Sequence, residues 1–429
     1  MTVAPAGRPT SSLAIIGALF FIIGFFTWIN GPLITFVKLA FDLDDVNAFL
    51  VLMVFYLSYF FLALPAASLL KITGMKRGLA LSLFVMAVGA ALFGELATQR
   101  WYPGALAGLF VIGGGLALLQ TAVNPYISIL GPIESAAQRI ALMGICNKVA
   151  GILAPLLIGS LVLHGIGDLS AQVQAADAAA RTQLLNDFAA KIHTPYLMMA
   201  GVLVLLAIAI LFSSLPELRP SEANAERGGD GIGKRSVFRF PHLWLGVLCL
   251  FVYVGVEVLA GDAIGTYGNG FGLPLDQTKL FTSYTLAAML LGYLVGLVAV
   301  SRFISQERYL GVSAALGVVF ALGAYLTHGY VSVGFIAALG FANAMMWPAI
   351  FPLAIRGLGR FTETGSAVLI MGIAGGAILP RLFVVLKQHY DFQAVFAWIV
   401  VPCYLYILYY ALHGHRAGAA AGAAARSPI

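Results

Sequence analysis

Apolar runs long enough to cross a membrane recur along nearly the whole chain. A helix that spans the hydrocarbon core needs about 20 largely apolar residues, and the 429 residues contain one such run after another. Hydrophobic residues make up 61% of the sequence and charged residues only 10%, which leaves little chain for a soluble domain. The sequence therefore predicts an all-α membrane protein that lies in the lipid bilayer.

Twelve spans follow from the charged and Gly/Pro-rich turns that separate these runs. We predict them at residues 13–37, 47–70, 77–97, 104–130, 140–164, 194–215, 241–268, 280–301, 309–327, 331–353, 364–386 and 393–412. The first run is too long for the core of a signal peptide, so it is interpreted as an uncleaved span.

The chain divides into two halves of six spans each. Residues 216–240 form a charged stretch rich in Gly, Ser and Pro, as expected of a cytoplasmic linker between residues 1–215 and 241–412. Residues 413–429 contain the low-complexity sequence "RAGAAAGAAARSPI" and are expected to be a disordered cytoplasmic tail. A polar stretch at residues 165–193 is expected on the outer side, where it could form a surface helix.

Lysine and arginine gather on one side of the predicted spans. With the N-terminus in the cytoplasm, 16 of the 24 basic residues fall in inside loops and termini and seven on the opposite side, with Lys148 left within a span. Both termini are therefore expected in the cytoplasm. The formal charge of +6 follows from this asymmetry, so it does not indicate nucleic-acid binding.

The two halves carry traces of an internal duplication. "QTAVNP" ends the fourth span and "NAMMWP" lies in the tenth, and aligning Pro125 with Pro348 pairs Gln120 with Asn343. The tripeptide "MGI" also recurs in the spans that follow. Two parallel repeats of six spans are the layout of transporters that bind substrate near mid-membrane, between halves that rock about it.

Three charged side chains stand out within predicted spans, where a charge costs at least about 2.5 kcal/mol unless it faces a cavity or a partner. Lys148 lies in the fifth span, and Glu257 and Asp262 lie in the seventh. We predict that Lys148 pairs with one of these carboxylates in one conformational state; the alternative is that it snorkels to the cytoplasmic surface. Glu257 is interpreted as functional, whereas Asp262 has a solvated helix end as its alternative.

Amides at the same depth favour a neutral, hydroxyl-rich ligand. Gln120 and Asn124 share one face of the fourth span, and Thr27 and Asn30 share one face of the first. Amides both donate and accept hydrogen bonds, and an aromatic ring packs on the apolar face of a sugar. The alternative is that these amides only join helices to one another. Asn124, beside Pro125, is interpreted as part of a helix bend.

Other functions find no support in the sequence. Cys146, Cys249 and Cys403 all lie in predicted spans without metal-ligand spacing, and "HGH" at residues 413–415 is interpreted as a solvated end. The triple glycine at residues 113–115 lacks the context of a phosphate loop and is expected to allow close packing of spans. No nucleophile and base appear together, so neither an enzyme, a metal site nor a cofactor is predicted.

Several segments resemble the fucose, galactose and glucose proton-symporter group of the major facilitator superfamily. The most specific are "LLQTAVNPYISILGP" and "QRIALMGICNKVAGILAP", the second of which holds Arg139 and Asn147. "WPAIFPLAIRGLG", which begins within the tenth span, is another. The resemblance implies cation-coupled monosaccharide uptake by alternating access. It also implies that Asn147 and Trp347 line the substrate cavity.

The chain departs from the fucose members at two acidic positions, which are Gly31 and Gln120 here. Glucose/galactose members also carry glutamine at the second position, so the resemblance favours a hexose such as glucose or galactose. The missing carboxylates make Glu257, and after it Asp262, the candidates for coupling to protons or sodium. "INGP" and "NKVAG" are similar to N-acetylglucosamine permeases, so an amino sugar is the alternative substrate; an exporter of small amphipathic compounds is another.

We therefore predict a monomeric sugar importer of the bacterial inner membrane with the major facilitator fold. Its substrate-binding residues are predicted to be Gln120, Asn147, Asn343, Trp347, Asn30 and Trp28. Its cation-coupling residues are predicted to be Glu257, Asp262 and Lys148.

Overall fold

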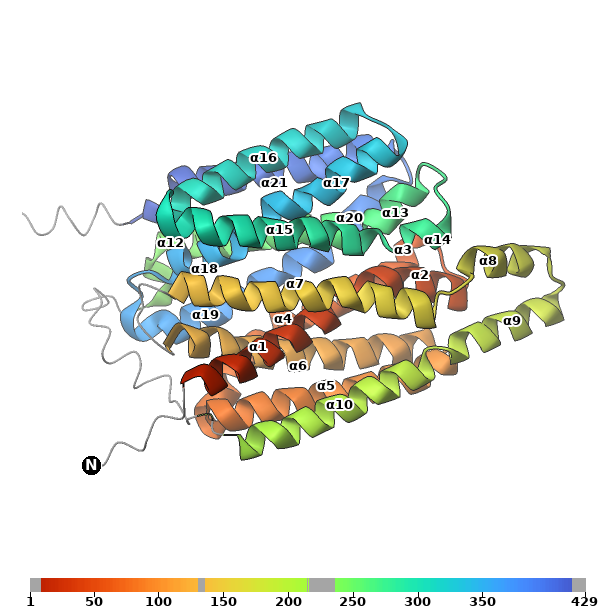
Figure 1. Cartoon of the computed structure of the whole chain (residues 1–429), viewed down its shortest axis with the longest axis horizontal. Coiled ribbons are helices and arrows are strands. Elements are labelled where there is room, and N and C mark those ends of the chain that lie inside the picture. The colour runs from red at the N-terminus through yellow and green to blue at the C-terminus, as the bar shows by residue number, and fades with distance from the viewer. Residues whose placement is uncertain (1–8, 130–135, 214, 216–235, 419–429) are drawn as a thin grey trace, which may run out of the picture.

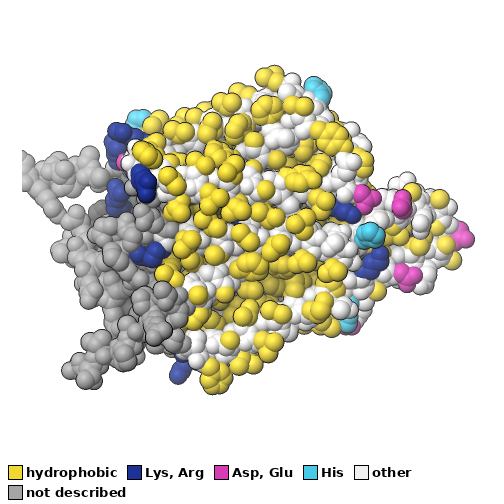
Figure 2. Space-filling view, viewed as in Figure 1, with side chains coloured by type: hydrophobic (Ala, Val, Ile, Leu, Met, Phe, Trp, Pro, Cys, Tyr) yellow, Lys and Arg dark blue, Asp and Glu magenta, His cyan; other side chains and the backbone are white. Residues whose placement is uncertain are grey.

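The computed structural model describes residues 9–129, 136–213, 215 and 236–418. Within these ranges twelve helices are long and apolar enough to cross a membrane, and each overlaps one predicted span. The predicted number of spans is thus confirmed. Figure 2 shows a broad hydrophobic surface around the middle of the molecule, with charged side chains toward its two ends and most of the visible acidic side chains at one of them.

Each half contributes six spans. The first six are α1 (Pro9–Trp28) with α2 (Asn30–Ala40), α4 (Leu50–Thr73), α5 (Met75–Thr98), α6 (Tyr102–Ile129), α7 (Ala136–Leu161) and α10 (His193–Phe212). The last six are α12 (Pro241–Gly261) with α13 (Ile264–Asn269), α15 (Phe281–Arg302), α16 (Gln306–Leu326), α17 (Gly329–Asn343) with α18 (Met346–Ile355), α19 (Thr362–Met371) with α20 (Gly375–Leu386), and α21 (Phe392–Leu412).

Short helices lie between the spans, within the eleventh span (η4) and after the last span (η5). They are α3 (Asp45–Ala48), α8 (Ile166–Ala175), α9 (Ala178–Ala190), α14 (Leu275–Thr278) and the 3-10 turns η2 (Val237–Arg239), η3 (Gly359–Phe361), η4 (Gly372–Ala374) and η5 (Gly414–Arg416). Figure 1 shows that α8 and α9 project from one end of the bundle, opposite the end where α1 begins. We call these the α8 end and the terminal end.

Two spans are interrupted where a proline removes a hydrogen bond. Pro32 has no N–H to donate to the carbonyl of Trp28, four residues earlier, and α1 ends at Trp28. Pro348 has the same relation to Ala344, which lies between α17 and α18. Both interruptions lie deep within their spans, so they re-aim the side chains beside them in the middle of the bundle.

The halves contact each other most extensively along two pairs of spans. α7 of the first half packs on α15 of the second, and α4 packs on α19 and α20. Within the first half, a Cβ atom built on Gly113 lies 2.5 Å from the carbonyl oxygen of Phe55, and one built on Gly115 lies 2.8 Å from that of Ser82. The triple glycine therefore allows α6 to pack closely on α4 and α5, as predicted.

The polar stretch at residues 165–193 forms two helices, α8 and α9, in place of the single surface helix expected from the sequence. Asp177 separates them because its side chain accepts a hydrogen bond from the N–H of Ala180, 2.8 Å away, and so caps a new helix.

The expected linker and tail fall mostly outside the described residues, which omit 216–235 and 419–429. At the start of the expected tail, residues 414–416 form the turn η5. The ring of His415 is buried and interacts with the carbonyl of Tyr410 at 3.1 Å. The interpretation of residues 413–415 as a solvated end is therefore wrong for Gly414 and His415, which are buried.

Candidate functional site

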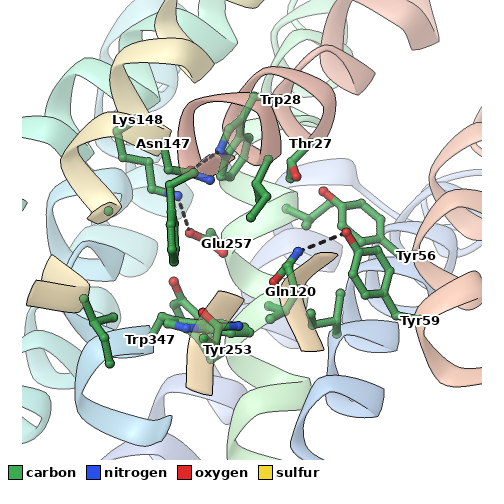
Figure 3. Close-up of a pocket in the computed structure, with 18 of the residues that line it drawn as sticks. Thr27, Trp28, Tyr56, Tyr59, Gln120, Asn147, Lys148, Tyr253, Glu257 and Trp347 are labelled. Carbon is green, nitrogen blue, oxygen red and sulfur yellow. Dashed lines mark hydrogen bonds and ion pairs between the residues drawn. The ribbon is translucent and has the colours of Figure 1, made fainter. Parts of the chain in front are cut away.

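A cavity lies between the two halves in the middle of the bundle (Figure 3). The cavity runs from the middle of the spans toward the terminal end. Its lining extends from Trp28 to Phe20 on α1 and from Lys148 to Ile140 on α7. The other lining side chains come from α4, α6, α12, α15, α18 and η4 and include Tyr56, Tyr59, Gln120, Asn124, Tyr253, Glu257, Tyr293, Trp347 and Ile373.

An ion pair joins the halves across this cavity. The ammonium of Lys148 lies 3.1 Å from Glu257 Oε1, and the two residues are 5% and 8% exposed. Lys148 Nζ also lies 4.5 Å from the centre of the Trp28 ring, where a cation is attracted to the π face. The predicted pairing of Lys148 with a carboxylate is confirmed for this conformation, and the snorkelling alternative is wrong.

Two amides present polar groups to the cavity. The indole N–H of Trp28 donates to Asn147 Oδ1 at 3.3 Å, so α1 and α7 hold each other's side chains in place. On the opposite wall, Gln120 Nε2 donates to the hydroxyl of Tyr59 at 3.0 Å. Figure 3 shows that these two pairs and the ion pair surround the same space. Amides held by one bond in this way keep further donor and acceptor capacity for a ligand.

Aromatic rings complete the wall. Trp347, at the start of α18, lines the cavity and stacks on Phe351 with an interplanar angle of 19°. Tyr253 lies below the ion pair in Figure 3 and Trp28 above it. The site thus combines polar groups with broad ring faces, which suits a ligand that has hydroxyl groups on its edges and an apolar face.

Two predicted substrate-binding amides lie elsewhere. Asn30 and Asn343 are both 0% exposed and are absent from the cavity wall. Asn30 Nδ2 donates to the carbonyl of Thr27 at 3.0 Å, and Asn343 Oδ1 accepts from the hydroxyl of Tyr404 at 2.7 Å. Neither can contact a ligand in this conformation, because each is completely buried.

Asp262 is also buried, at 2% exposure, so the interpretation as a solvated helix end is wrong. It follows the last residue of α12 and accepts a hydrogen bond on Oδ2 from the hydroxyl of Tyr56 at 3.2 Å. Because Tyr56 belongs to the first half and Asp262 to the second, this bond crosses between the halves. Asp262 itself does not line the cavity.

Tyrosines are the functional candidates that the sequence analysis missed. Tyr56, Tyr59, Tyr253 and Tyr293 all line the cavity. The spacing of Tyr56 and Tyr59 could have indicated them, because residues three positions apart share one face of a helix. Among the described residues, no three His, Cys, Asp or Glu side chains gather as a metal ion would require.

Comparison with known proteins identifies the family. The family model described as Major Facilitator Superfamily matches residues 16–380. The chain is 32% identical over 401 residues to a protein of Brucella abortus biovar 1 (strain 9-941) named glucose/galactose transporter, and the match covers 93% of this chain and 92% of that one. It is 28% identical over 372 residues to the L-fucose-proton symporter of Escherichia coli (strain K12), covering 85% and 84% of the two chains.

A solved structure shares the fold. The transporter FucP, described as a major facilitator transporter in the outward conformation, superimposes with a TM-score of 0.74 at 26% identity, covering 94% of this chain and 98% of the other. The chain is therefore a multi-pass membrane protein that belongs to the major facilitator superfamily.

Proposed function

We propose that this chain imports a monosaccharide, a hexose of the glucose or galactose type, across the bacterial inner membrane. It works as a monomer by cation-coupled alternating access. The observation that carries the proposal is the cavity between the halves, where Gln120, Asn147 and Trp347 offer amides and a ring face to one enclosed space. The names of the relatives, glucose/galactose transporter and L-fucose-proton symporter, support a sugar as the ligand.

Binding of the sugar is assigned to four residues. Gln120 and Asn147 bind hydroxyl groups from opposite walls, because an amide can both donate to and accept from a hydroxyl. Trp347 and Trp28 pack on the apolar face of the ring. A neutral sugar leaves the charges of Lys148 and Glu257 paired with each other, so binding does not require an unpaired charge in the cavity.

Alternating access is supported by the distribution of contacts between the halves. At the α8 end, Lys279 Nζ donates to the carbonyl of Leu163 at 2.9 Å, and the N–H of Gly167 donates to Asp276 at 3.1 Å. The cavity lining instead extends toward the terminal end. Given the basic residues near that end, we assign it, with both termini, to the cytoplasm. The chain is then in a conformation closed to the outside.

The experiment is uptake of radiolabelled glucose or galactose into proteoliposomes under an imposed pH or sodium gradient. We expect accumulation of label that unlabelled hexoses abolish and that collapse of the gradient prevents. If N-acetylglucosamine inhibits uptake of the label more strongly than hexoses do, the substrate is an amino sugar instead. Efflux of ethidium that sugars do not inhibit, with no sugar uptake, would contradict the proposal.

Trp347 provides a direct test of the binding site. Replacing it with alanine removes a ring face worth about 1 to 2 kcal/mol of sugar binding, so we expect KM for uptake to rise about five- to thirtyfold. Phenylalanine at the same position should restore most of the affinity. The matched control is Trp398→Ala, because Trp398 is 57% exposed on α21 and absent from the cavity wall. Equal KM values for the two alanine variants would show that Trp347 does not contribute to sugar binding.

A further inference from the structure

Asp262 occupies a buried position between the halves, behind the cavity. It lies at the C-terminus of α12, next to α2 and α4. A Cβ atom built on Gly31 of α2 lies 3.3 Å from Asp262 Oδ1, and Tyr56 of α4 donates to Oδ2 at 3.2 Å. Thr282 of α15, whose hydroxyl donates to the carbonyl of Gly261 at 2.8 Å, closes another side. Asp262 therefore contacts both halves where they meet.

The charges around Asp262 do not balance. The titratable groups that face it are Tyr56 from α4, Lys148 from α7 and Glu257 from α12, and α2 and α15 contribute Gly31 and Thr282, which carry no charge. Lys148 is the one cation among these groups, and it is already paired with Glu257. None of the ion pairs among the described residues includes Asp262. Two carboxyl groups thus share one cation, and a buried, unpaired carboxylate is costly.

A proton resolves this imbalance better than a divalent metal ion does. Hard divalent cations take about six oxygen ligands, whereas the structure gives Asp262 one side-chain hydrogen-bond partner, Tyr56, among the described residues. A proton needs only the carboxylate itself. Bound to Asp262, it leaves a neutral carboxyl group beside a balanced Lys148–Glu257 pair.

We propose that Asp262, and not Glu257, binds the proton that is transported with the sugar, and that Tyr56 links this proton to the closure of the α8 end. The inference deepens the proposed sugar symport and rests on it. When the halves separate at the α8 end, the hydrogen bond between Tyr56 and Asp262 breaks, and the carboxylate takes up a proton from the outside. Closure then buries a neutral carboxyl group, and the hydroxyl of Tyr56 returns to it.

Tyr56 also provides the exit for the proton. Its side chain lines the cavity while its hydroxyl contacts Asp262 (Figure 3 shows Tyr56 beside Tyr59 at the cavity wall). As the carboxyl O–H passes its proton to the tyrosine oxygen, the tyrosine gives its own proton to water in the cavity. Tyr56 ends neutral, Asp262 ends as a carboxylate, and one proton has moved to the terminal end.

The test compares Asp262→Asn with the unmodified protein in proteoliposomes. Asparagine has the shape of a protonated aspartate but cannot release a proton. We expect exchange of labelled sugar at equal concentrations to remain measurable, because Asp262 does not line the cavity. Accumulation driven by a pH gradient should fall to the equilibrium ratio, and the alkalinisation of a weakly buffered medium on sugar addition should disappear. If the Asp262→Asn variant still accumulates sugar above the equilibrium ratio under a pH gradient, the inference is overturned.

A second pair of variants keeps the test decisive if Asp262→Asn does not fold. Tyr56→Phe removes the hydroxyl that contacts Asp262, and we expect it to lower the accumulation ratio and the pH change more than it lowers the rate of exchange. Tyr59→Phe is its match, since Tyr59 lines the same cavity but bonds Gln120, so it should alter sugar KM and leave the accumulation ratio intact. Identical accumulation ratios in the two variants overturn the inference. Unmodified protein whose exchange responds to sodium but not to protons also overturns it, whereas absence of any sugar exchange contradicts the proposed function instead.

Discussion

Replacing Lys148 with methionine will abolish transport and destabilise the protein. The change removes the ammonium 3.1 Å from Glu257 and leaves a carboxylate unpaired inside the membrane. Breaking a buried ion pair by removing one partner costs about 3 to 5 kcal/mol. We therefore expect a clear drop in the thermal unfolding midpoint of the purified protein in detergent. Sugar exchange should fall at least about a hundredfold, because the cavity wall loses the contact that joins α7 to α12.

The double variant Lys148→Met with Glu257→Gln separates charge balance from transport. Because it leaves no unpaired charge, we expect its unfolding midpoint to return close to the unmodified value. Arg181→Met is the matched control for loss of an ion pair. Arg181 contacts Asp42 at 2.7 Å with both side chains largely exposed, and exposed pairs contribute about 0 to 1 kcal/mol. Lys148→Met with unchanged uptake, and unchanged dependence of uptake on pH or sodium, contradicts a role for the pair in transport.

The membrane-spanning architecture was predictable because it depends on local properties. The length of an apolar run and the turns around it determine where a span begins and ends, and no knowledge of neighbouring spans is needed. The partner of Lys148 was predictable for a related reason. A charge at this depth requires compensation, and the seventh span offers two acidic side chains, Glu257 near its middle and Asp262 toward its outer end.

The places of Asn343 and Asp262 were not predictable in this way. Aligning the two halves gives Asn343 the depth of Gln120, but depth does not determine which face of a helix a side chain occupies. Asn343 lies at the break between α17 and α18, and its side chain bonds the hydroxyl of Tyr404 in the same half. It therefore points away from the cavity. Asp262 looks like a helix end in sequence, yet Ala263 and Ile264 beyond it are also buried, so the chain remains inside the protein.

Gly31 shows what sequence comparison by itself leaves out. The resemblance to fucose symporters identifies a missing carboxylate at this position, which suggests that an acidic group has been lost. In the structure the carboxyl of Asp262 lies beside Gly31, supplied by the other half of the protein. The two residues are far apart in the sequence, and only the packing of α2 against the end of α12 brings them together.

Cross-linking Asp45 to Lys387 as cysteines will stop transport completely and reversibly. Asp45, at the start of α3 in the first half, pairs with Lys38 of its own half and with Lys387, which follows α20 in the second half. These groups lie at the α8 end, where Lys279 and Asp276 also reach the first half. If sugar enters from this end, the contact between Asp45 and Lys387 must break in every cycle, and a covalent bridge prevents it.

The measurement uses a protein whose Cys146, Cys249 and Cys403 have been replaced and which still transports. Treatment with a bifunctional thiol reagent that contains a disulfide should reduce uptake by the Asp45→Cys, Lys387→Cys variant to background, and a reducing agent should restore it. The matched control is Asp42→Cys with Arg181→Cys. This pair also makes contact at the α8 end but lies within the first half, so it should cross-link without loss of uptake. Full uptake by completely cross-linked Asp45→Cys, Lys387→Cys protein would show that the halves do not separate there, and that sugar does not enter between them.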